Sequence, residues 1–288
     1  MASCHTHAAS RYHAATRYHA ASRYHAATKC HAATRCHAAI RCNDIAVHKM
    51  YSPFLPCYFI EKLETMEIEP IAFFRSPFAT KFGIPKQSGL ADTLRGTIEF
   101  VPKYRNADAL RGMEDFDYLW LVWEFSANRH EATSPVVRPP RLGGNTKMGV
   151  FATRSPFRPN RLGLSSVRID RIDYDAADGP LIHVLGADLM DGTPIYDIKP
   201  YVTYADSHPD ARSGFVDTTA TRRLHVVFPD HLAKEFTAEE LASLEKVLAL
   251  DPRPQYHDNP TKVYGMEFAN RDVRFRVDGD RLEVVEIK

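Results

Sequence analysis

The stretch Tyr118-Leu-Trp-Leu-Val-Trp-Glu-Phe125 (YLWLVWEF) is a continuous apolar run that is rich in aromatic residues. Aromatic residues fit the pleated surface of a sheet, and the run is far too short for a membrane-spanning helix, which needs about 20 apolar residues. Turn-forming segments lie on both sides of it. The stretch therefore predicts a central, buried β-strand.

Shorter apolar segments surround this strand, separated by turns rich in proline and glycine, and helical periodicity is scarce. Short strands at such spacing are typical of a small closed barrel. We therefore predict a mainly β fold, with a β-barrel domain over residues 66–205. Its other strands are expected at 68–74, 97–101, 149–152, 165–172, 181–189 and 195–198, with one helical turn at 107–112.

The pattern changes after the barrel. A polar linker is expected at 208–221. Thr237 and Glu240 form a capping-box signature, and the leucines and valine that follow keep helical spacing up to Leu250. Three alternating segments, at 263–268, 273–277 and 282–287, complete the chain. These features predict a small α+β C-terminal domain over residues 222–288.

The N-terminal segment is a six-residue repeat of the type HAATRY that runs from His7 to Cys42. Six helical residues turn through about 600°, so no residue type returns to one face, and almost nothing apolar is larger than alanine. We predict a disordered, low-complexity extension over residues 1–65. A His/Cys metal tract or a basic RNA tether is the alternative, although the close pairs typical of zinc sites are missing.

Composition excludes several classes of protein. The five cysteines all lie in the first 57 residues, so the body has neither a disulfide framework nor a thiolate metal site, and we expect no metal. No apolar run reaches the length of a membrane span. These features favour the cytoplasm. Neither a phosphate-binding P-loop nor a Rossmann glycine fingerprint is present, so a nucleotide site of those types is not indicated.

Basic residues are concentrated between Ala132 and Ile169. Seven of them occur there without one acid, in a chain whose net charge is only +1. Prolines and glycines stiffen this region and let the backbone approach a ligand. Binding several phosphates would reduce the repulsion between these positive charges. RNA or DNA is therefore the first candidate partner. An ordinary solvated basic loop is the alternative.

The segment Asp188-Leu-Met-Asp-Gly-Thr-Pro-Ile-Tyr-Asp-Ile-Lys-Pro-Tyr201 places three carboxylates around a tight Asp191-Gly192 turn, after an apolar strand. Site residues often occupy loops at strand ends, and carboxylates there suit acid–base work or polar ligand binding. The alternative is an ordinary β-turn. The loop Phe82–Gly89 also carries polar groups but is uninformative alone.

Together these segments resemble the TrmO-like (TsaA-type) tRNA methyltransferases in order and spacing, over roughly residues 66–288. The matching motifs are PKQSGL, FDYLWLVWEF, RPPRLGGN, MGVFATRSPFRPNRLGLS, DLMDGTPIYDIKPY and LALDPRPQY. The repeat tract has no counterpart. Where the family has His-Gln after the aromatic strand, this chain has Ser126-Ala127, and Arg161 stands where proline is common.

The resemblance implies a small β-barrel, not a Rossmann sheet, in a homodimer that uses S-adenosylmethionine. The implied reaction methylates N6 of a threonylcarbamoylated adenosine at tRNA position 37, beside the anticodon, chiefly in a threonine tRNA. Implied cofactor contacts are Pro85, Lys86, Gln87, Ser126, Ala127, Arg154, Leu164, Asp188, Leu189, Met190 and Asp191. Expected tRNA contacts are Arg138, Arg141, Arg158, Arg161, Lys199 and Tyr201.

The adenine N6 lone pair is delocalised into the ring, so an acceptor that draws the N–H into place would help it react. We predict Asp191 for this role, with a backbone carbonyl as the alternative. Two further hypotheses come from other classes. One is a non-catalytic RNA-binding barrel, and the other is an interaction module whose arginines bind an acidic protein tail.

Overall fold

The computed structural model describes residues 66–128, 134–219, 222–254 and 259–288. All of them belong to one compact unit, Thr65–Lys288. The predicted N-terminal extension, residues 1–65, lies outside the described residues.

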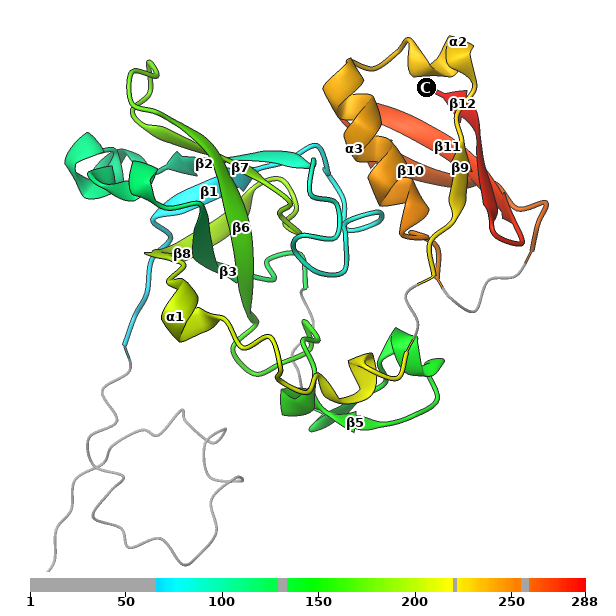
Figure 1. Ribbon diagram of the computed structural model, residues 1–288, viewed down its shortest axis with the longest axis horizontal. Helices are drawn as coiled ribbons and strands as arrows, with labels where there is room; N and C mark the ends of the chain where they lie inside the picture. The colour runs from blue at the N-terminus through cyan, green and yellow to red at the C-terminus, as the bar shows by residue number, and fades with distance from the viewer. Residues whose placement is uncertain (1–65, 129–133, 220–221, 255–258) are drawn as a thin grey trace, which may run out of the picture. The chain divides into compact units, whose positions relative to one another are not determined.

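Six antiparallel strands close into a barrel in the order β1-β2-β7-β6-β3-β8 (Figure 1). This confirms the predicted barrel. The strands are β1 (Ala72–Arg75), β2 (Arg95–Phe100), β3 (Tyr118–Glu124), β6 (Leu162–Asp173), β7 (Leu181–Leu185) and β8 (Thr193–Pro200).

The aromatic stretch is β3, and it pairs with β6 on one side and β8 on the other, so its predicted central position is confirmed. Its burial alternates. Leu119, Leu121 and Trp123 face the barrel interior, whereas Tyr118 is 43% exposed. The strand is thus buried along one face, because a single-layer barrel has an interior on only one face of each strand.

The strand expected at 149–152 is another difference. Only β5 (Met148–Gly149) pairs, with β4 (Val136–Val137), and Val150–Ala152 forms a 3₁₀ turn. Both the amide and the hydroxyl of Thr153 donate to the carbonyl of Val150, which closes the chain locally instead of leaving it for a ladder. Further 3₁₀ turns are Pro102–Tyr104, Ala107–Leu110, Met113–Asp115, Pro140–Leu142 and Gly214–Val216.

A second sheet, of order β10-β11-β12-β9, follows the barrel, and α3 packs on it (Figure 1). The predicted capping box starts α3: Thr237 Oγ1 accepts from the Glu240 amide, and the Glu240 carboxylate accepts from the Thr237 amide. β9, which pairs parallel to β12, was not predicted. The elements are α1 (Thr203–Asp206), β9 (His225–Val227), α2 (Asp230–Ala233), α3 (Ala238–Ala249), β10 (Tyr264–Phe268), β11 (Arg271–Asp278) and β12 (Arg281–Ile287).

Two hydrophobic cores result. One fills the barrel. The other lies between α3 and the second sheet, and it also takes in Phe78, Ala91 and Leu94 from residues 76–94, the segment that joins β1 to β2. We call this segment the β1–β2 loop. Because one core draws on both halves of the chain, the domain limits at residues 205 and 222 stay a prediction.

Candidate functional site

Three of the segments predicted to bind a cofactor meet beside the barrel. The β1–β2 loop contributes Gln87, whose side-chain oxygen accepts a hydrogen bond from the Arg154 guanidinium. The same loop reaches the segment between β7 and β8, where the amide of Gly89 donates to the carbonyl of Gly186 at 2.8 Å. The candidate site is therefore built from loops that lie far apart in sequence and are placed by the barrel strands.

Asp188 is the half-buried acid of this site. Trp123 Nε1 donates to Ser165 Oγ at 3.0 Å, and the Ser165 hydroxyl donates to Asp188 Oδ1 at 2.6 Å. Burial raises the pKa of the Asp188 carboxyl above its usual range, and the bond from Ser165 and the positive charge of Arg154 oppose that shift. The carboxyl is thus held in one orientation by Ser165, within electrostatic range of Arg154 and partly shielded from water.

Gly163 on β6 makes this arrangement possible. A Cβ at Gly163 would lie 2.3 Å from Cε2 of Trp123, well inside contact distance. Only glycine leaves room for the indole beside β6, where its N–H donates to Ser165. Of these three successive residues, Gly163 makes room for the indole, Ser165 links it to Asp188, and Leu164 faces outward.

Lys86 lies at the exposed tip of the β1–β2 loop, near charges from two other segments. Loss of surrounding water lowers the pKa of its ammonium group. The negative charge of Asp251 opposes this shift, and the positive charge of Arg141 adds to it. The structure thus places Lys86 within electrostatic range of Arg141 and of Asp251.

Asp191, the predicted catalytic acceptor, lies in the same β7–β8 segment as Asp188 but has different partners. Its Oδ1 accepts from the amide of Ser76 at 3.0 Å, and its Oδ2 lies 4.0 Å from Arg75 Nη1. The Asp191 amide donates to the carbonyl of Phe78. The carboxylate is partly exposed, so Oδ2 remains open to a further hydrogen bond.

The other predicted cofactor residues occupy varied environments. Leu189 is buried in the barrel core, and the Met190 carbonyl accepts from the Thr193 hydroxyl at 2.7 Å. The carbonyl of Ala127 accepts from Lys81 Nζ, and Ser126 is exposed beside it. Pro85 is buried. Leu164 is 56% exposed on the outer face of β6, so its side chain lies away from Asp188.

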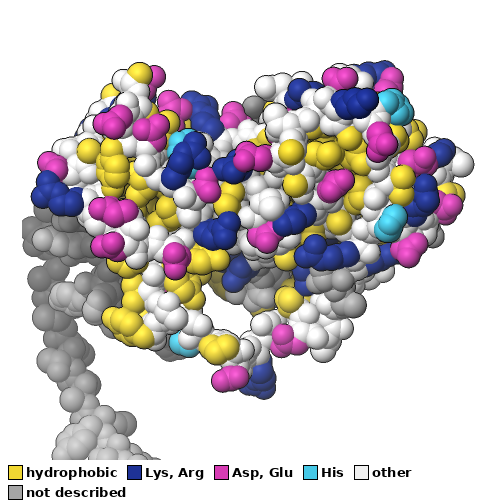
Figure 2. Space-filling view, turned by 45° about the horizontal axis from the view of Figure 1, so that its top comes forward, with side chains coloured by type: hydrophobic (Ala, Val, Ile, Leu, Met, Phe, Trp, Pro, Cys, Tyr) yellow, Lys and Arg dark blue, Asp and Glu magenta, His cyan; other side chains and the backbone are white. Residues whose placement is uncertain are grey.

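The basic region separates into two groups. Arg161 Nη2 lies 3.0 Å from Glu124 Oε1, and Arg158 Nη1 donates to the carbonyl of Thr153 at 3.1 Å. In contrast, no ion pair or hydrogen bond is found for the Arg138 and Arg141 guanidiniums among the residues that the structure describes. Two of the four predicted tRNA-contacting arginines are thus engaged within the protein. On the face shown in Figure 2, basic and acidic side chains are interspersed.

Glu124 also accepts a hydrogen bond from the Tyr196 hydroxyl, at 2.6 Å. Burial and this carboxylate together raise the pKa of Tyr196 to about 12, against the opposing charge of Arg161. Arg161, Glu124 and Tyr196 therefore form a small network at the end of β3, where the sequence predicted a charge that faces RNA.

Lys199 and Tyr201 lie at the end of β8, on the outer face of the barrel. Lys199 Nζ pairs with Asp197 at 3.1 Å. The Tyr201 ring contacts the rings of Trp120 and Tyr118, with centroids 5.8 and 6.1 Å apart. This partly exposed aromatic cluster is separate from the loops around Asp188.

Several residues that shape the site were not predicted. Trp123 and Glu124 appeared only as parts of an apolar strand, and Ser165 and Asp251 only as parts of motifs. A serine at an inward position of a buried strand is a signal that could have been found, because a buried hydroxyl needs a partner.

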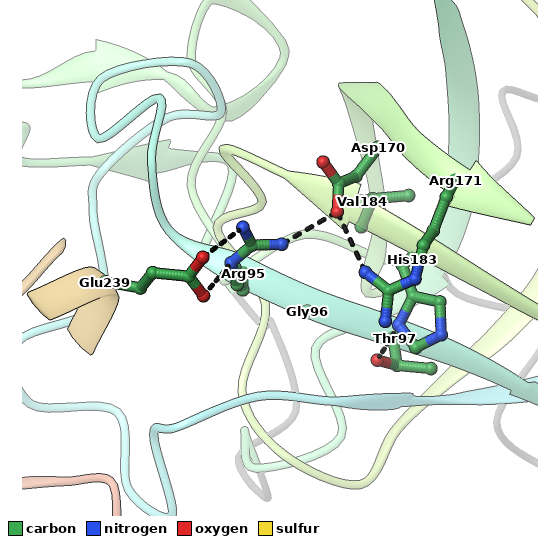
Figure 3. Close-up of a pocket in the computed structure, with 8 residues that line it drawn as sticks. All are labelled: Arg95, Gly96, Thr97, Asp170, Arg171, His183, Val184 and Glu239. Carbon is green, nitrogen blue, oxygen red and sulfur yellow. Dashed lines mark hydrogen bonds and ion pairs between the residues drawn. The ribbon is translucent and has the colours of Figure 1, made fainter. Parts of the chain in front are cut away.

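Neither a metal site nor a membrane span emerges from the described part of the chain. No group of three His, Cys, Asp or Glu side chains is arranged to hold a metal ion there, and no described helix is long and apolar enough to cross a membrane. A pocket of about 290 Å³ on the outer face of β2 and β7 is lined in part by Arg95, Thr97, His183 and Glu239 (Figure 3). None of the predicted site residues lines it.

Comparison with known proteins matches both parts of the chain. The family model for the tRNA-methyltransferase O N-terminal domain matches residues 73–207, and the model for the TrmO C-terminal domain matches residues 221–288. The tRNA (adenine(37)-N6)-methyltransferase of Escherichia coli (strain K12) is 36% identical over 234 residues, which cover 78% of this chain and 99% of that protein.

Two Pseudomonas aeruginosa relatives agree. A protein named for S-adenosylmethionine-dependent methyltransferase activity is 38% identical over 223 residues, covering 73% of this chain and 92% of that protein. The crystal structure of TrmO from that organism is 33% identical, with a TM-score of 0.65, and covers 79% of this chain and 99% of that chain.

Fold and comparisons together define a tRNA methyltransferase built on a β-barrel, and the class of enzyme expected from the sequence is confirmed. The chain belongs to the TrmO family.

Proposed function

We propose that this protein transfers a methyl group from S-adenosylmethionine to N6 of the adenine at tRNA position 37. The names of the Escherichia coli and Pseudomonas aeruginosa relatives support the position and the methyl donor. The observation that carries the proposal is the convergence of Gln87, Arg154 and Asp188 from three separate loops beside the barrel.

The residues around Asp188 fit this methyl donor. S-adenosylmethionine carries an ammonium group and a sulfonium, both positive, together with ribose hydroxyls. Asp188 offers a carboxylate of fixed orientation whose charged form is stabilised by a cation. Gln87 and Arg154 add a polar edge. When bound, S-adenosylmethionine supplies an activated methyl group on a positively charged sulfur.

The protein's own groups must orient the adenine and accept the proton that N6 loses. We propose Asp191 as the acceptor, because Ser76 fixes its Oδ1 and leaves Oδ2 open. The adjoining Gly192 has φ of 71°, which sets the turn that presents this carboxylate. The remaining predicted cofactor contacts, from Pro85 to Met190, act in this proposal through backbone groups as well as side chains.

The proposed substrate is adenosine that already carries the threonylcarbamoyl group, chiefly in a threonine tRNA. That group adds a carboxylate, which a planar guanidinium recognises through two parallel hydrogen bonds. Arg138 and Arg141 support this choice, since neither forms an ion pair within the described residues. Together with Arg158, Arg161, Lys199 and Tyr201, they form the proposed tRNA surface.

The proposal includes the homodimer and the cytoplasmic location that the family resemblance implies. Sedimentation of the purified protein checks the first. If the protein methylates tRNA at full rate as a monomer, the activity does not require a dimer.

The decisive experiment is mass spectrometry of anticodon-loop nucleosides from a deletion strain, followed by radiolabel transfer from S-adenosylmethionine to tRNA of that strain by the purified protein. Loss of the N6-methylated threonylcarbamoyl nucleoside and its restoration in vitro are expected. An unchanged nucleoside profile would overturn the proposal. Tight tRNA binding without transfer would favour the non-catalytic RNA-binding barrel instead.

A further inference from the structure

The β1–β2 loop has little means of holding its own shape. Residues 76–94 contain no strand or α-helix, and Lys86 and Gly89 at its tip are exposed. A loop without a hydrogen-bonded ladder takes its conformation from the elements that contact it. What contacts this loop therefore decides where Gln87 and its neighbours lie.

One side of the loop is attached to the barrel. The amide of Asp191 donates to the carbonyl of Phe78 at 2.9 Å, and the amide of Gly186 donates to the carbonyl of Leu94 at 2.8 Å. These bonds join the loop to the β7–β8 segment, which carries Asp188. They account for only one of the loop's two faces.

The other face is held by the C-terminal part of the chain. The amide of Ala269, in the β10–β11 turn, donates to the carbonyl of Pro77 at 2.9 Å. The Phe78 ring meets the Phe268 ring edge to face, with centroids 5.4 Å apart. A Cβ at Gly83 would lie 2.0 Å from Met266 Sδ, so this backbone lies directly against β10.

The second stem of the loop is held by one stripe of α3. Glu239, Ser243 and Lys246 are spaced by four and three residues, which places them on one face of the helix. The Ser243 hydroxyl lies 2.9 Å from the carbonyl of Thr93, and Lys246 Nζ lies 2.5 Å from Asp92 Oδ1.

Arg95 closes this row at the start of β2. Its guanidinium forms two bonds with Glu239, at 2.9 and 3.0 Å, and a third with Asp170 of β6, at 2.7 Å. Figure 3 shows Arg95 lying between the two carboxylates. The contacts of Asp92, Thr93 and Arg95 with α3 thus continue into the barrel wall.

We propose that residues 222–288 are a positioning element of the methyl-donor site, in which α3 and the β10–β11 turn hold the β1–β2 loop in its binding conformation. This inference rests on the proposed function only in taking Pro85–Gln87 as donor-binding residues. Lys246 and Ser243 are positioning residues, because they act through the loop and contact neither substrate nor cofactor.

A charge exchange across the Asp92–Lys246 pair tests the inference. Lys246→Glu and Asp92→Lys each oppose like charges, and the double variant restores an attractive pair. We expect each single variant to raise the KM and Kd for S-adenosylmethionine about twofold to tenfold, and the double variant to recover most of the loss. The kcat at saturating methyl donor and the Kd for tRNA should stay within about twofold.

Glu245→Lys is the matched control. It makes a charge change of the same size and sign as Asp92→Lys, on the exposed face of α3, where Glu245 has no partner among the described residues. It should leave the KM for S-adenosylmethionine unchanged. A general charge effect would move it together with the Asp92→Lys variant, and would overturn the inference.

Hydrogen exchange without any ligand supplies a second measurement. Each single variant should speed exchange of amides in residues 77–94, Gly89 included, while β3 amides stay protected; the double variant should reverse this. Unchanged loop exchange overturns the inference. So does faster exchange with an unchanged KM for S-adenosylmethionine. A third outcome separates the two proposals. If the variants exchange faster but the wild-type protein binds no S-adenosylmethionine, the proposed function is overturned, while the contact of residues 222–288 with the β1–β2 loop is supported.

Discussion

Arg161 Nη2 lies 3.0 Å from Glu124 Oε1, so a guanidinium that the sequence placed on an acid-free RNA surface is paired with the end of the aromatic strand. The acid is absent from the neighbouring sequence but is supplied by β3. Arg161 also donates to the carbonyl of Asn128 and has φ of 36°, a left-handed conformation. The arginines of the basic region therefore differ in how free they are to bind a polyanion, because Arg161 already has partners within the protein.

We predict that Arg161→Ala lowers stability as well as tRNA affinity, whereas Arg141→Ala lowers tRNA affinity alone. Loss of the Glu124 pair and of the Asn128 bond should cost about 1 kcal/mol, or about 2–4 °C in Tm. Arg141→Ala should leave Tm unchanged and reduce the slope of log Kd against log salt by about one. Thermal unfolding and tRNA titration at several salt concentrations check both. A reduced salt slope for Arg161→Ala with unchanged Tm would contradict the assignment.

Gly163→Ala should disturb the site through Trp123. The added methyl would lie 2.3 Å from the indole, so the ring must shift and its bond to Ser165 is lost. We expect a loss of about 1–3 kcal/mol in the free energy of unfolding, together with weaker S-adenosylmethionine binding. Gly149→Ala is the control, because nothing lies within 4 Å of its Cβ position and its φ is −58°. Equal losses in the two variants would contradict this account.

Substitutions at Asp191 and at Asp188 should have different effects, the first on kcat and the second on methyl-donor affinity. Asp191→Asn keeps the side-chain oxygen that accepts from Ser76 but removes the charged acceptor, so kcat should fall by about 10²- to 10⁴-fold with methyl-donor affinity nearly unchanged. Asp188→Asn should instead raise the Kd for S-adenosylmethionine. Single-turnover kinetics and calorimetry separate the two effects. If Asp191→Asn weakened methyl-donor binding and left the single-turnover rate unchanged, the proposed acceptor role would be lost.

Local signals explain which parts of the structure could be predicted. The α3 capping box needs only Thr237 and Glu240, three residues apart, and it is present as predicted. The short strands and turns likewise specify a barrel. The bond between Ser165 and Asp188 joins residues 23 positions apart, and it exists only because barrel closure brings β6 to the β7–β8 segment. Leu164 was matched by motif, whereas strand alternation turns its side chain outward.

The half-buried carboxyl of Asp188 gives a pH dependence whose sign follows from its raised pKa. In the unfolded chain the group ionises near the usual value of about 3.9, so in the empty protein its contribution to stability is greatest below that pH and falls as pH rises through the folded-state pKa. A bound cation favours the ionised form, so S-adenosylmethionine affinity should rise over the same interval. Asp188→Asn should therefore raise the Tm of the empty protein at neutral pH and flatten the pH dependence of binding. Calorimetry across that interval, with Asp197→Asn as a control at a half-exposed carboxylate, checks both effects. A variant that loses stability at neutral pH and keeps the wild-type binding profile would show that Asp188 is a structural acceptor for Ser165 alone.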